Sequence, residues 1–490
     1  MIGNFVKILC VILLPAAASA RDLTITLQDA IDMARVKSVD AAEALDELKT
    51  AYWEWRTFRA DQLPEVNFTS TLPSYAKQYT SYMNENGEYS FVSSNTLEAS
   101  GQLQIKQNVR LTGGTVSLTS SLDFLRQFDN GVGNCFMTIP VALTISQPIF
   151  GVNTMKWDAR IEPVKYAEAK AKFLSATEDV AKMTVEYYFT LIMSRENVDI
   201  ARQNLANAEK LYSVAVEKRK MGTISENDLL QMELNVLDAR SSLTDYASTL
   251  KSSMFQLRSF LDLDDDVDII PVIPEQVPHV DVAFDEALDK ALTNNKFAKN
   301  MLRRQLEADY QVAKAKGDLR EINLYVQIGY TGADNNLSAA YNRLRTNQIA
   351  QIGISIPLLD WGKRRGAVKV AESNRRVTES TLRRETSTFN QDLFVLVERF
   401  DNQQSQLDIA QRANEIAQRR YATNVETYLI GKISTLDLND TQVTKDESRR
   451  DYINELYKFW NYWYQLRSLT LYDWQKRGDI NADIDRIVKM

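Results

Sequence analysis

The chain switches between two hydrophobic periods, which predict helices and strands in turn. Residues 27–61 place apolar side chains at helical spacing and contain no Pro or Gly, so we expect a helix that ends before Pro64. Apolar and polar residues then alternate with a period of two, which is typical of β-strands. The segments with this alternation are 66–72, 97–109, 116–124 and 139–145, with a Gly113-Gly114 turn between the second and third.

The same order returns later in the chain. Residues 284–317 predict a second helix, and two alternating strands follow it. Their apolar residues are Leu324, Val326, Ile328 and Tyr330, then Ile352, Ile354 and Ile356, and the opposite face is small and polar. Such alternation fits a soluble half-buried sheet or a barrel with a lipid face and a wet lumen, and the pattern alone leaves both open.

Two predicted helices are far longer than a globular core needs. They cover about 152–220, after Pro148, and about 362–430, after Pro357. At ~1.5 Å rise per residue each would extend about 100 Å. Heptad spacing within the first predicts a coiled-coil seam of Val198, Ala201, Leu205, Ala208, Tyr212 and Ala215.

Each long helix is expected to turn back on itself. Gly222 and Gly431 end the two helices, and Ser225 and Ser434 are suitable N-caps for returning helices at 226–261 and 435–472. The returning helices are about half as long as their partners. We expect the helices at 27–61 and 284–317 to match the remaining halves end to end.

An internal duplication accounts for this recurrence. Residues 199–229 and 408–438 align without a gap at an offset of 209, with 12 identities in 31 positions. The shared string Gly-x-Ile-Ser-x-x-Asp-Leu begins at Gly222 and at Gly431. Matches of this kind exceed what two unrelated amphipathic helices would share, so we read two repeats of one unit.

The predicted organisation has five parts. Lys7, a short apolar run and Ala18-Ser19-Ala20 are typical of a secretory signal peptide. The linker between the repeats is rich in Asp and Pro. The parts are a signal peptide at 1–20, repeat 1 at 21–261, the linker at 262–283, repeat 2 at 284–475 and a C-terminal tail at 476–490.

Composition excludes several classes of function. The formal net charge is -7 and no basic patch stands out, which argues against a nucleic-acid partner. His279 is the single histidine, and no nucleophile motif, phosphate-binding Gly loop or Cys/His cluster occurs. We therefore expect no enzyme activity, no metal site and no cofactor.

The order of elements resembles the TolC-like outer-membrane efflux family over essentially the whole mature chain. The motifs that carry the resemblance are Ser146-Gln147-Pro148-Ile149-Phe150-Gly151, Ile356-Pro357-Leu358-Leu359-Asp360-Trp361-Gly362 and the two tip strings. The resemblance implies an α+β membrane protein. Each repeat would give strands to a trimeric transmembrane β-barrel in outer-membrane lipid and coiled-coil helices to a periplasmic α-barrel.

The family resemblance also implies partners and a function. The chain would be a homotrimeric, passive channel of a tripartite efflux or type I secretion system. It would join a periplasmic adaptor (membrane fusion) protein and an inner-membrane pump of the resistance-nodulation-division or ABC type. The alternative is a soluble periplasmic coiled-coil scaffold or adaptor, which predicts one hairpin and a membrane anchor or lipid-bearing Cys.

The strand region of the first repeat departs from the simplest family pattern. The span from Asn67 to Gln147 is 80 residues, whereas the matching span from Asn323 to Ile356 is 33. The excess contains an additional alternating hairpin and a polar stretch at Asn84-Glu85-Asn86-Gly87. This hairpin either enlarges the barrel or lies outside it.

The resemblance assigns the candidate site residues to the hairpin tips. Asp437 and Asp440 match a pair of lumen-facing aspartates, and three copies would form an acidic, cation-selective gate. Asp228 and Tyr428 match a latch that holds the closed tips together, but Ile433 replaces the arginine of that latch. The expected adaptor contacts are Met221, Gly222, Thr223, Ile430, Gly431 and Lys432.

Overall fold

The computed structural model describes residues 21–83, 87, 89–128, 133–319, 321–355, 359–429, 432–433 and 435–488. The expected signal peptide lies outside these residues. The chain forms two compact units, which we call the hairpin unit and the sheet unit. The hairpin unit comprises Met1–Glu47, Ala171–Asn295 and Asn390–Ile487, and the sheet unit comprises Leu48–Lys170, Lys296–Phe389 and Val488–Met490.

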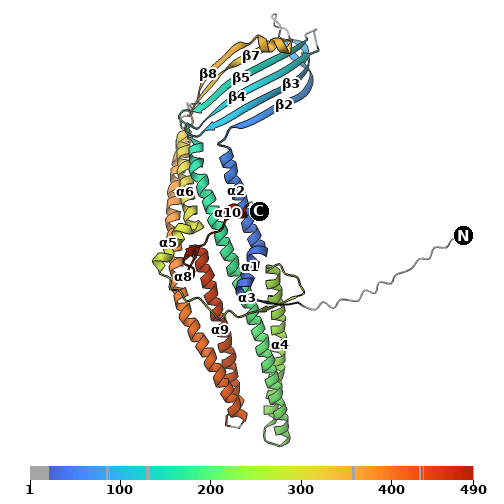
Figure 1. The fold of residues 1–490 in the computed structure, drawn as a ribbon, viewed down its shortest axis with the longest axis vertical. Coiled ribbons are helices and arrows are strands. Elements are labelled where there is room, and N and C mark those ends of the chain that lie inside the picture. The colour runs from blue at the N-terminus through green and yellow to red at the C-terminus, as the bar shows by residue number, and fades with distance from the viewer. Residues whose placement is uncertain are drawn as a thin grey trace, which may run out of the picture. The chain divides into compact units, whose positions relative to one another are not determined.

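The sheet unit contains one antiparallel sheet of six strands in the order β2-β3-β4-β5-β7-β8 (Figure 1). The expected extra hairpin is β2–β3, which is hydrogen-bonded to β4 as part of the same sheet. The strands are β2 (Glu65–Met83), β3 (Tyr89–Val109), β4 (Gly114–Gln127), β5 (Asn134–Pro148), β7 (Glu321–Asp334) and β8 (Arg345–Ser355).

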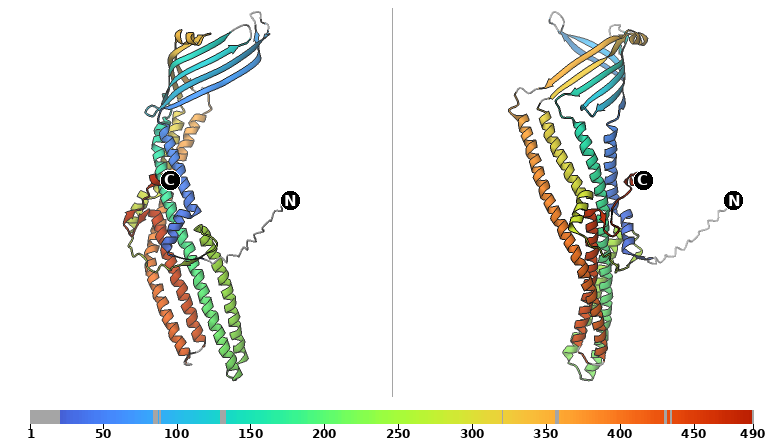
Figure 2. Two further views of the ribbon diagram at one scale, coloured as in Figure 1. Left: turned by 45° about the vertical axis from the view of Figure 1, so that its right-hand side comes forward. Right: turned by 60° about the vertical axis from the view of Figure 1, so that its left-hand side comes forward.

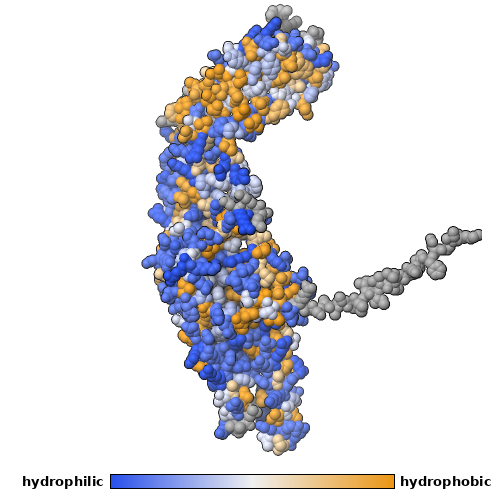
Figure 3. All heavy atoms as spheres, in the orientation of Figure 1, coloured by the Kyte–Doolittle hydropathy of each residue, from blue (hydrophilic) through white to orange (hydrophobic). Residues whose placement is uncertain are grey.

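The predicted alternation holds across the sheet and divides it into two faces. Register places Val66, Ile105, Leu118, Leu143 and Ile328 in one row across five strands, and all five side chains are exposed. Ser, Thr, Gln and Asn dominate the opposite face. Hydrophobic side chains gather over the sheet in Figure 3. The sheet therefore has one apolar face that stays exposed among the described residues of the unit.

Two prolines lie inside strands without breaking the sheet. Register shifts occur between Thr71 and Ser74 on β2 and between Thr138 and Val141 on β5. Pro73 and Pro140 lie within these shifts. A bulge leaves a backbone position unpaired, so the missing N–H of proline costs no ladder hydrogen bond there.

The helices of the sheet unit are held together by ion pairs and aromatic contacts. Arg303 of α6 (Lys296–Gly317) donates to Glu168 of α3 (Thr154–Lys220) at 2.6 Å. Arg304 forms an ion pair with Glu385 of α8 (Lys363–Leu429) at 2.6 Å. Phe297 stacks on Phe389 at a ring-centroid distance of 4.4 Å.

The hairpin unit contains two antiparallel helical hairpins, as the sequence predicts. The second halves of α3 and α8 pair with α4 (Glu226–Phe260) and α9 (Thr435–Thr470), respectively (Figures 1 and 2). Both long helices contain 67 residues. Phe400 and Phe459 are fully buried, with ring centroids 5.4 Å apart between α8 and α9.

The prediction of two uninterrupted short helices is wrong in the same way in both repeats. Ser38 separates α1 (Leu27–Lys37) from α2 (Val39–Ala60), and Asn295 separates α5 (Phe284–Asn294) from α6. Both residues are extended, with ψ near 150°. The Ser38 hydroxyl accepts from the Ala41 N–H, and such local bonds of small polar side chains compete with a continuous helix. Asn295 instead donates to the carbonyl of Leu469, a residue distant in sequence, at 2.7 Å.

The region between the repeats contains a strand that hydrophobic periodicity did not indicate. Within the predicted linker, β6 (Val267–Pro271) pairs in parallel with β1 (Arg21–Ile25). The buried Tyr188 hydroxyl donates to the carbonyls of Ile25 and Val272 at 2.9 and 2.7 Å. Four further short elements were not predicted from the sequence. They are α7 (Leu337–Asn342), the pair β9 (Tyr472–Asp473) and β10 (Gly478–Asp479), and α10 (Ile484–Ile487).

A buried ionic network ties the two repeats together. Glu178 of α3 is 2% exposed and accepts from Arg35 of α1 at 2.6 Å and from Arg467 of α9 at 2.8 Å. Arg467 also bonds to Asp473 at 2.7 Å. Burial opposes the charged form of Arg467, but its bonds to Glu178 and Asp473 prevail and raise its pKa. The bonds to Glu178 and Asp473 therefore favour the charged form of Arg467.

Removing the carboxylate at the centre of this network should destabilise the hairpin unit. We expect Glu178→Gln to lower the free energy of unfolding by about 3 kcal/mol, because it leaves two arginines short of a counter-charge in a buried site. Denaturant unfolding of the purified protein measures this change. The control is Glu47→Gln, which breaks the exposed pair with Lys172 and should cost less than about 1 kcal/mol. Equal losses in the two variants would contradict the assigned role.

Candidate functional site: the hairpin tips

The first tip is a tight turn closed by backbone hydrogen bonds. Gly222 has φ +74°, a conformation that glycine adopts at little cost. Its N–H donates to the Arg219 carbonyl at 2.9 Å, and the Thr223 N–H donates to the Lys218 carbonyl at 3.0 Å. This pair of bonds is the Schellman motif, which satisfies the last carbonyls of α3. The tip geometry therefore follows from a glycine at this position.

Ser225 and Asp228 form a reciprocal cap at the start of α4. The Ser225 hydroxyl accepts from the Asp228 N–H at 3.1 Å, while the Asp228 carboxylate accepts from the Ser225 hydroxyl at 2.7 Å and from its N–H at 3.1 Å. These bonds lower the pKa of Asp228 below its ordinary 3.8. The cap is complete above that value and is lost as the pH falls through the lowered pKa.

The second tip repeats the same turn. The Lys432 N–H donates to the Thr427 carbonyl at 3.1 Å, which is the equivalent of the Thr223–Lys218 bond at the repeat offset. Ile430, Gly431 and Ser434 lie outside the described residues. The described parts of both tips therefore agree with one turn type.

The two predicted gate aspartates lie in the first turns of α9. Both side chains are exposed, and their spacing of three residues places them on one helix face. Asp437 is also the repeat equivalent of Asp228, so the duplicated sequence gives it the position of a helix cap. Asp440 forms an ion pair with Arg420 of α8 at 3.4 Å.

Of the two side chains of the predicted latch, only that of Asp228 belongs to the described part of the structure. Asp228 is bonded to Ser225 within its own turn. Tyr428 lies in the last turn of α8, and its side chain is outside the described part of the chain. The contact between Asp228 and Tyr428 therefore stays a prediction.

Pairs of opposite charge bridge both turns, and sequence reasoning missed them. In the sequence, Arg420 and Asp440 lie at similar separations before and after Gly431, and they form an ion pair. Arg219 and Glu226 lie in the same way around Gly222, with their charged groups 3.7 Å apart. An antiparallel hairpin brings such positions together, so charges placed symmetrically about each tip glycine were the available signal. Arg420 adds a cation directly beside a predicted acidic gate.

A polar cluster joins the two hairpins some way from the tips. Asn204 of α3 donates to Asp446 of α9 at 3.1 Å and accepts from Gln442. Asn207 donates to the Tyr421 hydroxyl of α8 at 3.3 Å. Asp446 is 3% exposed and forms an ion pair with Lys445 at 3.0 Å. Motions of one hairpin relative to the other must break these bonds.

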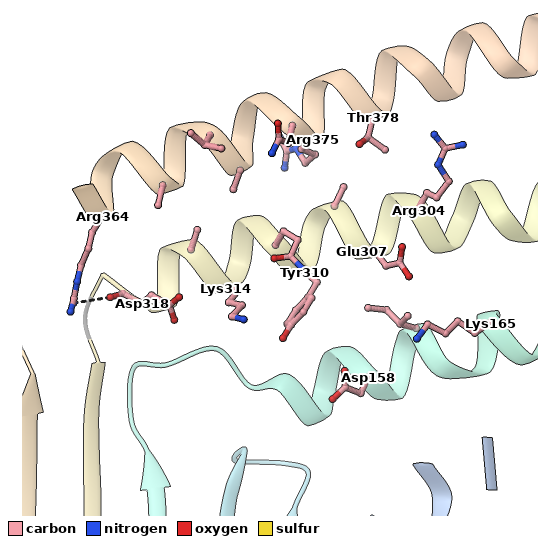
Figure 4. Close-up of a pocket in the computed structure, with 18 of the residues that line it drawn as sticks. Asp158, Lys165, Arg304, Glu307, Tyr310, Lys314, Asp318, Arg364, Arg375 and Thr378 are labelled. Atoms are coloured by element: carbon pink, nitrogen blue, oxygen red, sulfur yellow. Dashed lines mark hydrogen bonds between the residues drawn. The ribbon is translucent and has the colours of Figure 1, made fainter. Parts of the chain in front are cut away.

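The sheet unit also carries an open groove of about 1150 Å³ (Figure 4). Helices α3, α6 and α8 line it. Burial, and then repulsion from Glu162, raise the pKa of Asp158 in its wall. Lys165 bonds to Glu162 at 2.8 Å, and Arg364 donates to the Asp318 carbonyl at 2.9 Å. The described lining contains no Ser, Cys or His.

No group of three or more His, Cys, Asp or Glu side chains in the described chain is arranged to hold a metal ion. Among the described helices, none combines the length and apolar character needed to cross a membrane.

Comparison with known proteins decides the family. A family model described as outer membrane efflux protein matches residues 128–261 and 287–470, one segment in each repeat. The chain belongs to the outer membrane efflux protein family. No curated protein has a sequence that matches this chain closely enough to count as a relative.

Solved structures with the same fold are distant in sequence. The Campylobacter jejuni CmeC outer membrane channel aligns with a TM-score of 0.66 and 16% identity, covering 94% of this chain and 88% of that one. CusC aligns with 0.62 and 15% identity over 91% of each chain. The Vibrio cholerae outer membrane protein VceC aligns with 0.62 and 12% identity over 93% and 97%.

Membership in the family settles several of the expectations. This efflux protein has an α+β fold with an internal repeat, and its place is the outer membrane, with helices extending into the periplasm. Its family consists of channels rather than enzymes, and we identify the chain as an outer-membrane efflux channel. The soluble scaffold alternative is accordingly disfavoured.

The cap at the first tip can be tested locally. Ser225→Ala removes both side-chain bonds of the serine and should cost about 1 kcal/mol in local stability. We therefore expect roughly fivefold faster amide hydrogen exchange in the first turn of α4, measured by mass spectrometry. Ser241→Ala, an exposed position in the middle of α4, is the matched control. If the two variants exchange alike at the tip, the cap does not hold the turn.

Proposed function

We propose that the chain is one subunit of a homotrimeric conduit in a tripartite efflux or type I secretion system. The observation that carries the proposal is the sheet of six strands. One of its faces is apolar and exposed, and among the described residues neither of its edges has a partner strand. Unpaired backbone groups cannot face lipid, and six strands are fewer than the ~8 of the smallest membrane barrels. Other copies of the chain would complete the wall.

The conduit itself would be passive, and partners would supply the energy. An inner-membrane pump, of the resistance-nodulation-division or ABC type, would load substrate through a periplasmic adaptor protein. The described helical tips are suited to dock that adaptor, since Met221 is 69% exposed beside Gly222 and Thr223. On the second tip, Ile430, Gly431 and Lys432 would provide the equivalent contact.

The gate would be formed by Asp437 and Asp440 of three copies. Six carboxylates in one constriction would attract cations and bind divalent ions. Arg420 offsets part of this charge because it pairs with Asp440. The net charge of the gate thus depends on the balance between α8 and α9.

The latch would involve Asp228 and Tyr428 across neighbouring tips. Asp228 would have to exchange its bonds with Ser225 for a bond to the tyrosine hydroxyl, or share its carboxylate between them. Because Ile433 replaces the family arginine, the closed state would be held by fewer charged bonds here.

The subunit assembly can be tested directly. We expect protein extracted from outer membranes to have the mass of a trimer and to conduct ions when added to a planar bilayer. Native mass measurement and conductance recording give the two readings. A monomer without conductance would overturn the proposal.

Removing negative charges from the proposed gate and removing the neighbouring positive charge should have opposite effects on block by divalent cations. Asp437→Asn combined with Asp440→Asn should weaken block by divalent cations roughly tenfold or more, because six negative charges are lost together. Arg420→Gln should strengthen the block. Asp451→Asn, an exposed change further along α9, is the control and should leave block unaltered. Unchanged cation selectivity in the double variant would remove these aspartates from the gate.

A further inference from the structure

We propose that the barrel has 18 strands, because each of three copies contributes all six strands of its sheet. In this arrangement the β2–β3 hairpin is part of the wall, and the outer edge of β2 pairs with β8 of the next copy. The inference rests on the trimer proposed above and concerns what that trimer is built from.

The first argument is the continuity of the ladder between β3 and β4. The two strands pair without interruption from Thr96 with Gln127 to Val109 with Gly114. β4 therefore has no free edge to offer to a neighbouring copy. A barrel without the hairpin would have to break this whole ladder, and only β4 could regain its backbone bonds from a neighbouring copy, while those of β3 would be lost.

The second argument is the continuity of the apolar face into the hairpin. Val66 of β2 and Ile105 of β3 lie in the same cross-strand row as Leu118 and Leu143. Phe68, the next apolar residue on β2, is 72% exposed. If the hairpin lay outside the barrel in water, these side chains would have no apolar surroundings. In the wall they face lipid at the level of the other strands.

The third argument is the direction of the edges. Six consecutively antiparallel strands leave β2 and β8 running in opposite directions. The β8 edge of one copy and the β2 edge of the next can therefore form an antiparallel ladder like the five within the sheet. An even number of strands per copy makes every junction of the closed barrel equivalent.

The hairpin also continues beyond the sheet. From Asn95 towards its tip, β2 is the only partner strand of β3 within the described part of the chain. At this level Tyr75 packs against Phe128 with ring centroids 6.2 Å apart. Aromatic side chains collect where membrane barrels leave the lipid, so this contact fits the outer boundary of the wall. The ribbon past it would project from the membrane.

A wall of this size has a consequence for transport. Barrels of 16–18 strands enclose an aqueous channel. The strand end of the conduit would then be wide enough for solutes without moving, and restriction of flow would fall to the helical tips.

Thiol crosslinking distinguishes the two possible junctions. In a Cys135→Ser background, Thr69→Cys on β2 is combined in turn with cysteine at Asn347, Ile349 and Gln351 on β8, and a short thiol crosslinker is added to outer membranes. The polar face of the sheet carries all four positions. We expect crosslinked dimers and trimers for at least one pair. The control replaces Thr69→Cys with Thr119→Cys on β4, which should crosslink to no β8 position of a neighbour.

Each outcome decides the inference. Intermolecular crosslinks from β4 instead of β2 would overturn it and leave the trimer intact. If neither strand crosslinks, electron cryomicroscopy of the extracted protein counts the strands directly. A trimer with 18 strands supports the inference, and a trimer with four strands per copy overturns it. A monomeric particle would instead refute the proposed function.

Discussion

The need to pair every backbone group along the edges of one sheet constrains the rest of this protein. A six-stranded sheet with an uncovered apolar face cannot satisfy β2 and β8 by itself. In the proposed trimer, assembly would be part of the fold rather than an addition to it. The strand parity, the apolar row and the bulges at Pro73 and Pro140 would then all serve a surface that further copies complete.

The hairpin unit depends on two kinds of contact, one within each hairpin and one between the two hairpins. Two hairpins must keep separate turns while remaining attached to each other. The turns are set by tip glycines and backbone bonds, whereas the attachment depends on polar contacts such as Glu178 with Arg467 and Asn204 with Asp446. Bonds of the second kind are specific in position. They fix which residues of the two repeats face one another. A uniform apolar interface would not fix that register.

Much of this architecture was predictable because long-period features dominate it. Helices of 67 residues and strands with alternating apolar and polar residues leave a strong pattern in the sequence. The breaks at Ser38 and Asn295 were missed because a single polar residue decides them. The β1–β6 pair was missed because its strands lie far apart in the chain. Among the site residues, Asp228 and Asp440 lie at the tips as expected, but their partners Ser225 and Arg420 depend on side-chain geometry.

The matching helix breaks at Ser38 and Asn295 show which part of the two repeats differs in length. Their offset is 257 positions, whereas the tip sequences are offset by 209. The difference of 48 falls between these landmarks and is close to the length of the β2–β3 hairpin with its turns. The hairpin is thus an insertion that leaves the lengths and the order of the helices unchanged. Adding strands two at a time preserves the direction of the closing edge, so the circumference of the proposed barrel would change independently of the helical bundle. In that barrel, the pore diameter in the membrane and the geometry of the tips in the periplasm would vary separately.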